Sequence, residues 1–320
     1  MVVEAIIAVV ALIAGIALLI YSSDKAVLHS ISIASALRIS PLMIGLVLMS
    51  IGTDLPEIVN DIMSSALGHG DITIGDSLGS VLTQITLVLG LLPFLGGMFN
   101  VKRREIVVIG ACEVLALMLV VSIVSTGYIS RVSALFLVAS WPIFMLITRK
   151  ATAKNSKKKE YAVPRANRRP SYHILVASLG FIGVAIGAYV VIQSVITLSE
   201  AFHVPEYLIS FFIVAIGTSL PEFVVDLTAL RKKQYELAIG DAVGSCIVDA
   251  TLSCGIGPLL FPIRVSGELA MVTGLYAILA SVVVILTLAL RERVDRKAGA
   301  LFIALYLLSY TTFYVYEVVV

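Results

Sequence analysis

Charged residues are scarce in this chain: they make up 14% of its 320 residues, whereas 59% are hydrophobic and the mean hydropathy is +1.03. A soluble domain of this size needs far more charge to cover its surface. Apolar runs of about 20 residues recur, which is long enough to cross a hydrocarbon core about 30 Å thick. The composition therefore excludes a soluble globular protein and predicts an integral protein of the cell membrane, surrounded by the lipid bilayer.

Cysteine and histidine are also few. The three cysteines, Cys112, Cys246 and Cys254, fall in apolar segments, which indicates packing and not disulfides or a metal cluster. The four histidines lie near predicted loops without metal-ligand spacing. The first apolar run lacks the basic start of a signal peptide, so we interpret it as a membrane span. We expect no nucleic-acid partner and no cofactor, and the sequence leaves the oligomeric state open.

The apolar runs predict an all-α membrane protein with ten transmembrane helices. The predicted spans are 2–21, 41–67, 72–98, 105–126, 132–148, 173–198, 207–230, 236–262, 268–290 and 298–318. The loops after the odd-numbered spans hold 21 of the 23 Lys and Arg residues, and the opposite side holds only Arg131 and Arg264. The positive-inside rule therefore predicts cytoplasmic odd-numbered loops and external N- and C-termini.

A shift of 165 residues brings the stretch 51–93 onto 216–258 without a gap, and 17 of the 43 positions are then identical. Each half holds five predicted spans, and an odd number inserts the second half upside down. The pattern predicts two inverted five-helix repeats, residues 1–148 and 173–320, joined by a basic cytoplasmic linker at 149–172. Inverted repeats are typical of secondary transporters.

Carboxylates occur inside the predicted spans without basic partners. These buried acids are Asp54, Glu57, Asp61, Asp76, Glu113, Glu222, Asp226, Asp241 and Asp249. An ionised carboxylate at mid-membrane costs several kcal/mol unless it is paired. Because no Lys or Arg lies in the spans, the compensating charge must be bound cations or protons. Oxygen ligands of this kind suit calcium, sodium or magnesium.

The repeated motifs fall where a helix is expected to break. Pro56 and Pro221 interrupt the second and seventh spans, and a broken helix leaves backbone carbonyls that need a cavity or an ion. Two stripes at helical spacing face the same region. They are Asp76, Ser80 and Gln84 in the third span, and Asp241, Ser245 and Asp249 in the eighth. We therefore expect each half to supply one part of a single ion site.

At these residues the chain resembles a known family. GTDLPE with GDSLGS, and GTSLPE with GDAVGS, are similar to the two alpha repeats of the calcium/cation antiporter superfamily, in particular prokaryotic sodium/calcium exchangers. The resemblance implies that calcium leaves in exchange for sodium by alternating access. It implies that Glu57 and Glu222 bind calcium, with the carbonyls of Thr53 and Thr218. It implies sodium positions at Ser80, Ser219 and Ser245, with the carbonyls of Ser50 and Ala215.

Several positions depart from the family pattern. Asp54 replaces the usual serine, Asp76 and Asp241 replace asparagine, and Gln84 stands where asparagine is common, whereas Asp249 is of the sodium type. For Asp61, Asp76, Asp226 and Asp241 three roles stay open. They bind an ion directly, they carry protons, or they hydrogen-bond the neighbouring broken helix. A proton-driven antiporter of calcium or another divalent cation is therefore the alternative to a sodium-driven one.

Two readings from other classes fit less well. An intramembrane aspartyl protease uses a GxGD motif, but Thr73 and Ala238 stand where the first glycine belongs. That reading also leaves the duplicated glutamate motif unexplained. A channel is disfavoured because inverted repeats around a carboxylate site suit occlusion. We therefore expect a transporter and not an enzyme.

Overall fold

The computed structural model describes residues 2–37, 40–152, 170–199, 211–212 and 215–319. Nearly all of these residues are helical, which confirms the prediction of a helical membrane protein. Among them, six helices are long and apolar enough to cross a membrane, or seven if one pair that is bent by 46° counts as a single span.

The helices follow one another along the chain with short connections. The first half forms α1 (Val2–Leu37), α2 (Pro41–Ile44), α3 (Ser50–Thr53), α4 (Leu55–Leu67), α5 (Gly70–Leu82), α6 (Leu89–Leu95), α7 (Arg103–Val124) and α8 (Arg131–Thr152). The second half forms α9 (Pro170–Ser199), α11 (Ala215–Thr218), α12 (Leu220–Arg231), α13 (Tyr235–Val248), α14 (Cys254–Leu260), α15 (Gly267–Arg291) and α16 (Arg296–Val319). π-Helical segments join several of these: η1 (Gly45–Met49), η2 (Thr83–Val88) and η5 (Asp249–Ser253).

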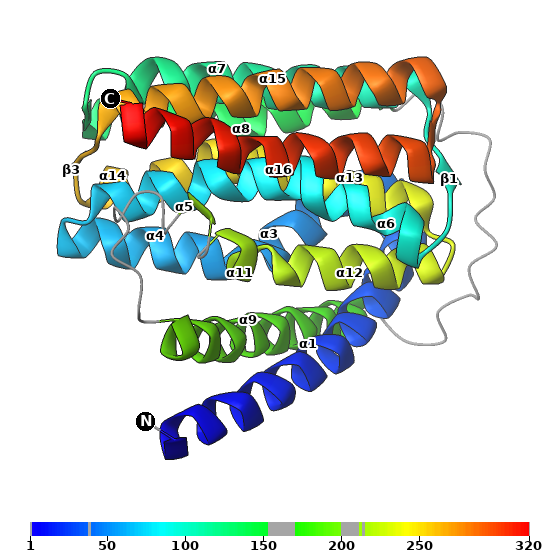
Figure 1. Ribbon diagram of the computed structural model, residues 1–320. Helices are drawn as coiled ribbons and strands as arrows, with labels where there is room; N and C mark the ends of the chain where they lie inside the picture. Colours follow the sequence, from blue (N-terminus) through cyan, green and yellow to red (C-terminus); the bar gives the residue numbers. More distant parts are fainter. Residues whose placement is uncertain (1, 38–39, 153–169, 200–210, 213–214, 320) are drawn as a thin grey trace.

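The helices with the repeated motifs lie between two outer groups (Figure 1). The long helices α1 and α9 pack along each other at one edge, and α7 and α15 lie at the opposite edge. Helices α4, α5, α12 and α13 run between them. This arrangement surrounds the polar residues of the motifs with protein on both sides.

Two short β-ribbons depart from the all-α prediction. β1 (Phe99–Asn100) pairs with β4 (Arg293–Val294), and β2 (Tyr128–Ile129) pairs with β3 (Ile263–Arg264), both antiparallel. Each ribbon joins a loop of the first half to a loop of the second. In Figure 1, β1 lies at the right-hand end of the molecule and β3 at the left-hand end, where α1 begins and α16 ends.

Some predicted boundaries are wrong. Helix α1 continues to Leu37, although the predicted span ends at residue 21, because Asp24 and Lys25 end the apolar run but do not stop the helix. Hydropathy reports where apolar sequence ends, whereas the Ala- and Leu-containing segment beyond it still favours a helix. Helices α8 and α9 likewise take up both edges of the linker predicted at 149–172. Residues 153–169 of that linker, and 207–210 and 213–214 of the predicted seventh span, lie outside the described residues.

Glycines let the central helices approach closely. A Cβ on Gly79 would lie 2.1 Å from the backbone oxygen of Phe211, and a Cβ on Gly244 would lie 2.8 Å from Cα of Leu46. Any larger residue would push the backbones apart. This packing holds α5 against the segment before α11, and α13 against the segment before α3.

Candidate ion-binding site

Each half contains a helix that breaks at one residue. Helix α3 ends at Asp54, whose φ and ψ are −75° and 5°, and α4 begins directly after it. Helix α11 ends at Ser219, where φ and ψ are −79° and 2°. Pro56 and Pro221 follow two residues later and have no N–H, so the carbonyls four residues before them receive no helical hydrogen bond from them. The helices are therefore interrupted at both predicted positions, and at Asp54 the break lies within a bent pair that is long and apolar enough to form one span.

The breaks place two glutamates at helix N-termini. Glu57 lies in the first turn of α4 and Glu222 in the first turn of α12. A helix N-terminus carries about half a positive charge, which favours an acidic side chain there. Both glutamates are 0% exposed. The local sequence thus fixes two acids in the interior, one from each half, at positions where the backbone offsets part of their charge.

A third carboxylate joins them. One oxygen from each of Asp54, Glu57 and Glu222 lies within 4.8 Å of the corresponding oxygen of the other two. Oxygens on opposite sides of a calcium ion are about 4.6–5.2 Å apart, twice the usual 2.3–2.6 Å bond. We call these three residues the carboxylate cluster. Its spacing fits a bound calcium ion.

Nothing in the described part of the chain neutralises the carboxylate cluster. All six of its carboxylate oxygens are buried without a hydrogen-bond partner. No described Lys or Arg is among the buried residues. Three buried carboxyl groups without donors or cations cost far more than a packed apolar core unless protons or metal ions bind there. The arrangement is therefore suited to hold cations.

The predicted polar stripes on α5 and α13 reach the two breaks. Ser80 Oγ lies 3.2 Å from Thr218 Oγ1, and Thr53 Oγ1 lies 3.5 Å from Ser245 Oγ. These two pairs are related by the same shift of 165 residues. Each stripe therefore touches the break of the opposite half, and the structure brings residues of both halves together.

The other members of the stripes differ in their partners. Asp76 accepts hydrogen bonds from Asn60 Nδ2 at 2.6 Å and Thr218 Oγ1 at 3.0 Å. Asp249 accepts one from Ser253 at 3.3 Å, and its second oxygen is buried without a partner. Both oxygens of Asp241 are buried without a partner. Gln84 Oε1 accepts from Cys246 Sγ at 3.5 Å, which leaves its amide nitrogen unpartnered.

Backbone carbonyls at the breaks are partly occupied. The Ser50 carbonyl accepts from Asp54 N at 2.9 Å and from Thr53 Oγ1 at 3.2 Å. The Ala215 carbonyl accepts from Ser219 N at 3.0 Å and from Thr218 Oγ1 at 3.3 Å. Each oxygen thus uses both lone pairs within its own helix turn. The Ser219 hydroxyl, in contrast, is buried without a partner.

The sequence did not reveal several supporting residues. Asn60 donates to Asp76, and Ser77 donates to Asp61 at 2.6 Å. Asn60 lies outside the two motifs, and Ser77 lies within GDSLGS but is not repeated, because Ala242 stands at its counterpart. The buried Glu113 accepts from Ser281 Oγ at 2.6 Å across α7 and α15. A single hydroxyl or amide carries no pattern of its own, so only the spatial arrangement could identify these donors.

Comparisons with known proteins support the same interpretation. The sodium/calcium exchanger protein family matches residues 7–150 and again residues 172–315. The chain is 28% identical over 295 residues to an uncharacterised membrane protein, MJ0091, of Methanocaldococcus jannaschii, which covers 92% of this chain and 94% of the relative. It is 25% identical over 332 residues to the sodium/calcium exchanger MaX1 of Methanosarcina acetivorans, covering 92% and 95%.

A solved structure is similar in fold as well. The sodium-calcium exchanger NCX_Mj, soaked with Na⁺ and Sr²⁺, matches with a TM-score of 0.77 and 28% sequence identity, over 96% of this chain and 99% of that chain.

Proposed function

Because this chain belongs to the sodium/calcium exchanger protein family and exchanges calcium for sodium across a membrane, we propose that the carboxylate cluster is its ion-binding site. The observation that carries the proposal is the cluster itself: Asp54, Glu57 and Glu222 lie within 4.8 Å of one another, fully buried. No described basic side chain is buried with them.

Calcium takes about six to eight oxygen ligands. Glu57 and Glu222 supply carboxylate oxygens from opposite halves, and Asp54 adds a third. The backbone carbonyls of Thr53 and Thr218, at the ends of α3 and α11, complete part of the shell. A doubly charged ion offsets most of the charge of the three carboxylates, which explains why they tolerate one another without donors.

Sodium binds at the hydroxyl and amide positions around the cluster. Ser219 is the best placed, because its hydroxyl has no partner in the described structure. Ser80, Ser245, Gln84 and Asp249 provide further oxygens. The carbonyls of Ser50 and Ala215 can join only after a hydrogen bond within their own turn opens, since both lone pairs are occupied.

Asp76 and Asp241 have different roles. Asp76 already accepts from Asn60 and Thr218, so it positions α4 and the second break and does not bind an ion directly. Asp241 has no such donors and remains a candidate ligand. This division is tested by comparing Asp76→Asn with Asp241→Asn for sodium dependence of calcium transport, where only the Asp241 variant changes the sodium requirement.

The transport cycle requires a symmetric frame, which we infer to be ten spans in two inverted repeats, 1–148 and 173–320, around the 149–172 linker. The shift of 165 residues exchanges the Ser80–Thr218 pair with the Thr53–Ser245 pair. It carries the contact of Gly79 with Phe211 onto that of Gly244 with Leu46. It also carries β2 onto β4, and β1 to within one residue of β3, so that one ribbon maps onto the other. Alternating access then follows when the two repeats exchange conformations, so that the site opens first to one side of the membrane and then to the other.

The orientation places the basic loops and the linker in the cytoplasm and both termini outside, following the segregation of Lys and Arg. After replacement of the native cysteines, Lys158→Cys is not labelled by an impermeant thiol reagent in intact cells. Tyr128→Cys, an exposed position at the opposite end, is the matched control and is labelled readily. Ready labelling at position 158 would overturn this orientation.

The driving ion is tested in proteoliposomes. Radioactive calcium uptake is measured with a sodium gradient, with a proton gradient, and with both collapsed. A sodium-driven exchanger accumulates calcium only with the sodium gradient. Uptake that follows the proton gradient alone would replace this proposal with the proton-driven alternative. No uptake under either gradient would contradict antiport of calcium altogether.

A further inference from the structure

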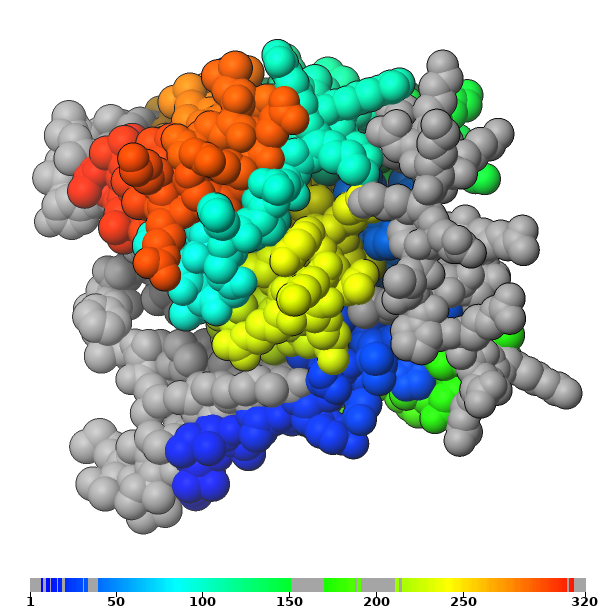
Figure 2. Space-filling model, turned by 90° about the vertical axis from the view of Figure 1, so that its right-hand side faces the viewer, coloured from blue at the N-terminus to red at the C-terminus, as the bar shows by residue number. Residues whose placement is uncertain are grey.

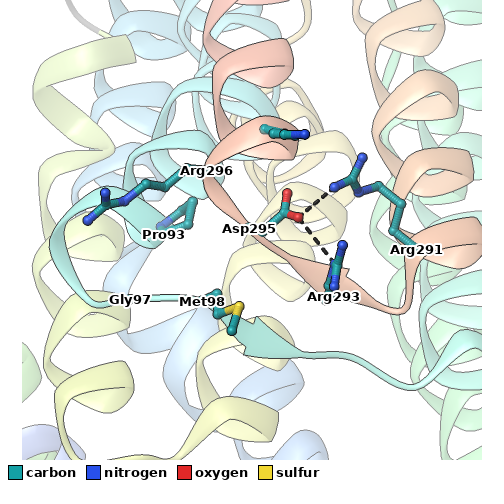
Figure 3. A pocket seen from close by; sticks show the side chains of 8 residues that line it. Pro93, Gly97, Met98, Arg291, Arg293, Asp295 and Arg296 are labelled. Carbon is teal, nitrogen blue, oxygen red and sulfur yellow. Dashed lines mark hydrogen bonds and ion pairs between the residues drawn. The ribbon is translucent and has the colours of Figure 1, made fainter.

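A cavity of about 780 Å³ lies beside the β1–β4 ribbon (Figure 3), and none of its lining residues belongs to the carboxylate cluster. It is lined by residues from the end of α6, the loop before β1, and the segment between α15 and α16. These are Pro93, Gly97, Met98, Arg291, Arg293, Asp295, Arg296 and Lys297. Four of the eight lining residues are cationic and one is acidic, so the cavity carries an excess of positive charge.

The single acid does not neutralise the cavity. Arg291 and Arg293 converge on Asp295 at 2.5 and 3.2 Å (Figure 3). The Ala298 N–H donates to the same carboxylate at 3.0 Å. This backbone hydrogen bond, and then the two guanidinium groups, hold the pKa of Asp295 below its usual range. Asp295 is thus an anion that is already saturated with donors.

Two cations remain without such a partner. Arg296 and Lys297 are exposed and form no ion pair within the described residues. In Figure 3 the Arg296 guanidinium extends past Pro93, away from Asp295. The Nε atom of Arg291 is also buried without a hydrogen-bond partner. The cavity therefore holds several donors that an anion can satisfy.

The opposite end of the molecule shows that the fold does not need these cations. The shift of 165 residues relates Arg296 to Arg131, which donates to the Leu260 carbonyl at 3.3 Å. It relates Asp295 to Ser130, which accepts from Ser133 N at 3.1 Å as a helix cap. Thr126 and Tyr128 stand where Arg291 and Arg293 stand in the second half. The same ribbon and cap thus form with a single cation at the four positions that match the cations of the cavity, and this residue, Arg131, is hydrogen-bonded within the protein.

Apolar side chains border the basic cavity. Met98, which lines the cavity, is 71% exposed. Phe94, Leu95 and Leu290, which lie within two residues of a lining residue in the sequence, are 41%, 52% and 75% exposed. On the face shown in Figure 2, the segments around β1 and β4 lie side by side in teal and orange. Basic groups next to exposed apolar groups at the end of membrane helices match the boundary between headgroups and acyl chains.

We propose that this cavity binds an anionic phospholipid, with its phosphate at the unpaired cations Arg296 and Lys297 and its acyl chains against the bordering apolar side chains. A free phosphate offers the same anionic oxygens but has no chains to cover Met98 and Leu290. The apolar border therefore selects the lipid. Binding there ties the segment between α15 and α16 to the loop after α6, and so links the two halves at one membrane surface.

The test measures lipid contact directly. In a background without native cysteines, Met98→Cys carries a fluorophore, and the protein is placed in nanodiscs of phosphatidylcholine. Phosphatidylglycerol with a nitroxide on its acyl chain is titrated in, and the same nitroxide on phosphatidylcholine is the reference. We expect at least tenfold stronger quenching by the anionic lipid. Equal quenching by both lipids would overturn the proposal.

Variants separate the cavity from the general surface charge. Arg296→Gln with Lys297→Gln weakens phosphatidylglycerol binding about 25-fold, which is about fivefold for each charge removed near a membrane surface. Arg103→Gln with Arg104→Gln removes the same charge from the neighbouring helix start outside the cavity and leaves binding nearly unchanged. An equal loss in both double variants would show diffuse attraction only and contradict the site. If inorganic phosphate at millimolar concentration displaces the lipid, the cavity is a free-anion site and the lipid assignment is wrong.

Discussion

In the first half of the chain Asp61 and Asp76 accept hydrogen bonds from uncharged side chains, whereas their counterparts Asp226 and Asp241 have no hydrogen-bond partner among the described residues. The donors Asn60 and Ser77 are replaced in the second half by Val225 and Ala242, both fully buried. The carboxyl groups of Asp226 and Asp241 instead interact electrostatically with each other.

This difference separates two uses of buried acids. Hydrogen-bond donors stabilise Asp61 and Asp76 as parts of the scaffold, because neutral donors offset part of the desolvation of a carboxylate. Asp226 and Asp241 lack that compensation and need protons or a cation. The two breaks also differ, but there the first half carries the extra acid, since the counterpart of Asp54 is Ser219. The duplicated backbone thus holds an unequal distribution of charge.

The largest expected effect comes from the glutamates that the two halves share. Glu57→Gln or Glu222→Gln removes a charged calcium ligand from a fully buried cluster. We expect calcium transport in proteoliposomes to fall about 100-fold or more, since removal of one partner from a buried charged set costs about 3–5 kcal/mol. Equal losses in both variants would show that the halves contribute alike.

Glu113→Gln is the matched control for these variants. Glu113 is equally buried, but its carboxylate accepts from Ser281 and lies on α7, outside the carboxylate cluster. We expect this variant to keep most of its calcium transport. A loss as large as that of Glu57→Gln would mean that any buried acid is needed, and the special status of the cluster would be lost.

A smaller effect is expected at the position where the breaks differ. Asp54→Ser makes the first half like the second and removes one charge from the cluster, while the hydroxyl still offers an oxygen. We expect the apparent affinity for calcium to fall about 10-fold and the dependence on sodium to become steeper. Calcium flux titrated against both ions measures this. Unchanged titrations would place Asp54 outside the ion site and make it a structural acid at the break.

The last prediction concerns stability instead of transport, at the two aspartate pairs Asp61 with Asp76 and Asp226 with Asp241. Asp226→Asn supplies an amide donor to Asp241, and we expect it to raise the free energy of unfolding in detergent by about 1–3 kcal/mol. Asp61→Asn weakens the hydrogen bond from Ser77, and we expect it to lower the free energy of unfolding by about 1 kcal/mol. Thermal unfolding of both variants measures the difference. Destabilisation of similar size by both would show that the two pairs are equivalent.

The helical architecture and the two breaks could be predicted from the sequence because they depend on strong local signals. Apolar runs identify membrane helices, and a proline two residues after Asp54 or Ser219 marks the break. The extension of α1 to Leu37 and the π-helical segments could not be predicted. Hydropathy shows where an apolar run ends, but it does not show whether the helix continues or changes its hydrogen-bond pattern. The β1–β4 and β2–β3 ribbons pair loops of different halves, and only two residues of each strand take part.

The two glutamates of the site could also be predicted from the sequence, but the residues that hydrogen-bond the neighbouring acids could not. Repetition pointed to Glu57 and Glu222, because chance does not duplicate a glutamate after a proline inside two apolar spans. Asn60 donates to Asp76 across one turn of α4 and the start of α5, and its counterpart is a valine. Such a contact depends on how two helices pack, which no spacing along the chain reveals.

The central claim is that the carboxylate cluster holds the transported divalent ion. Crystals grown with calcium and soaked with strontium give an anomalous difference map that locates the bound ion without reference to any mutation. We predict one strong peak between the carboxylate oxygens of Glu57 and Glu222 and within bonding distance of Asp54. A peak beside Asp226 and Asp241, with none among the three clustered acids, would contradict the account.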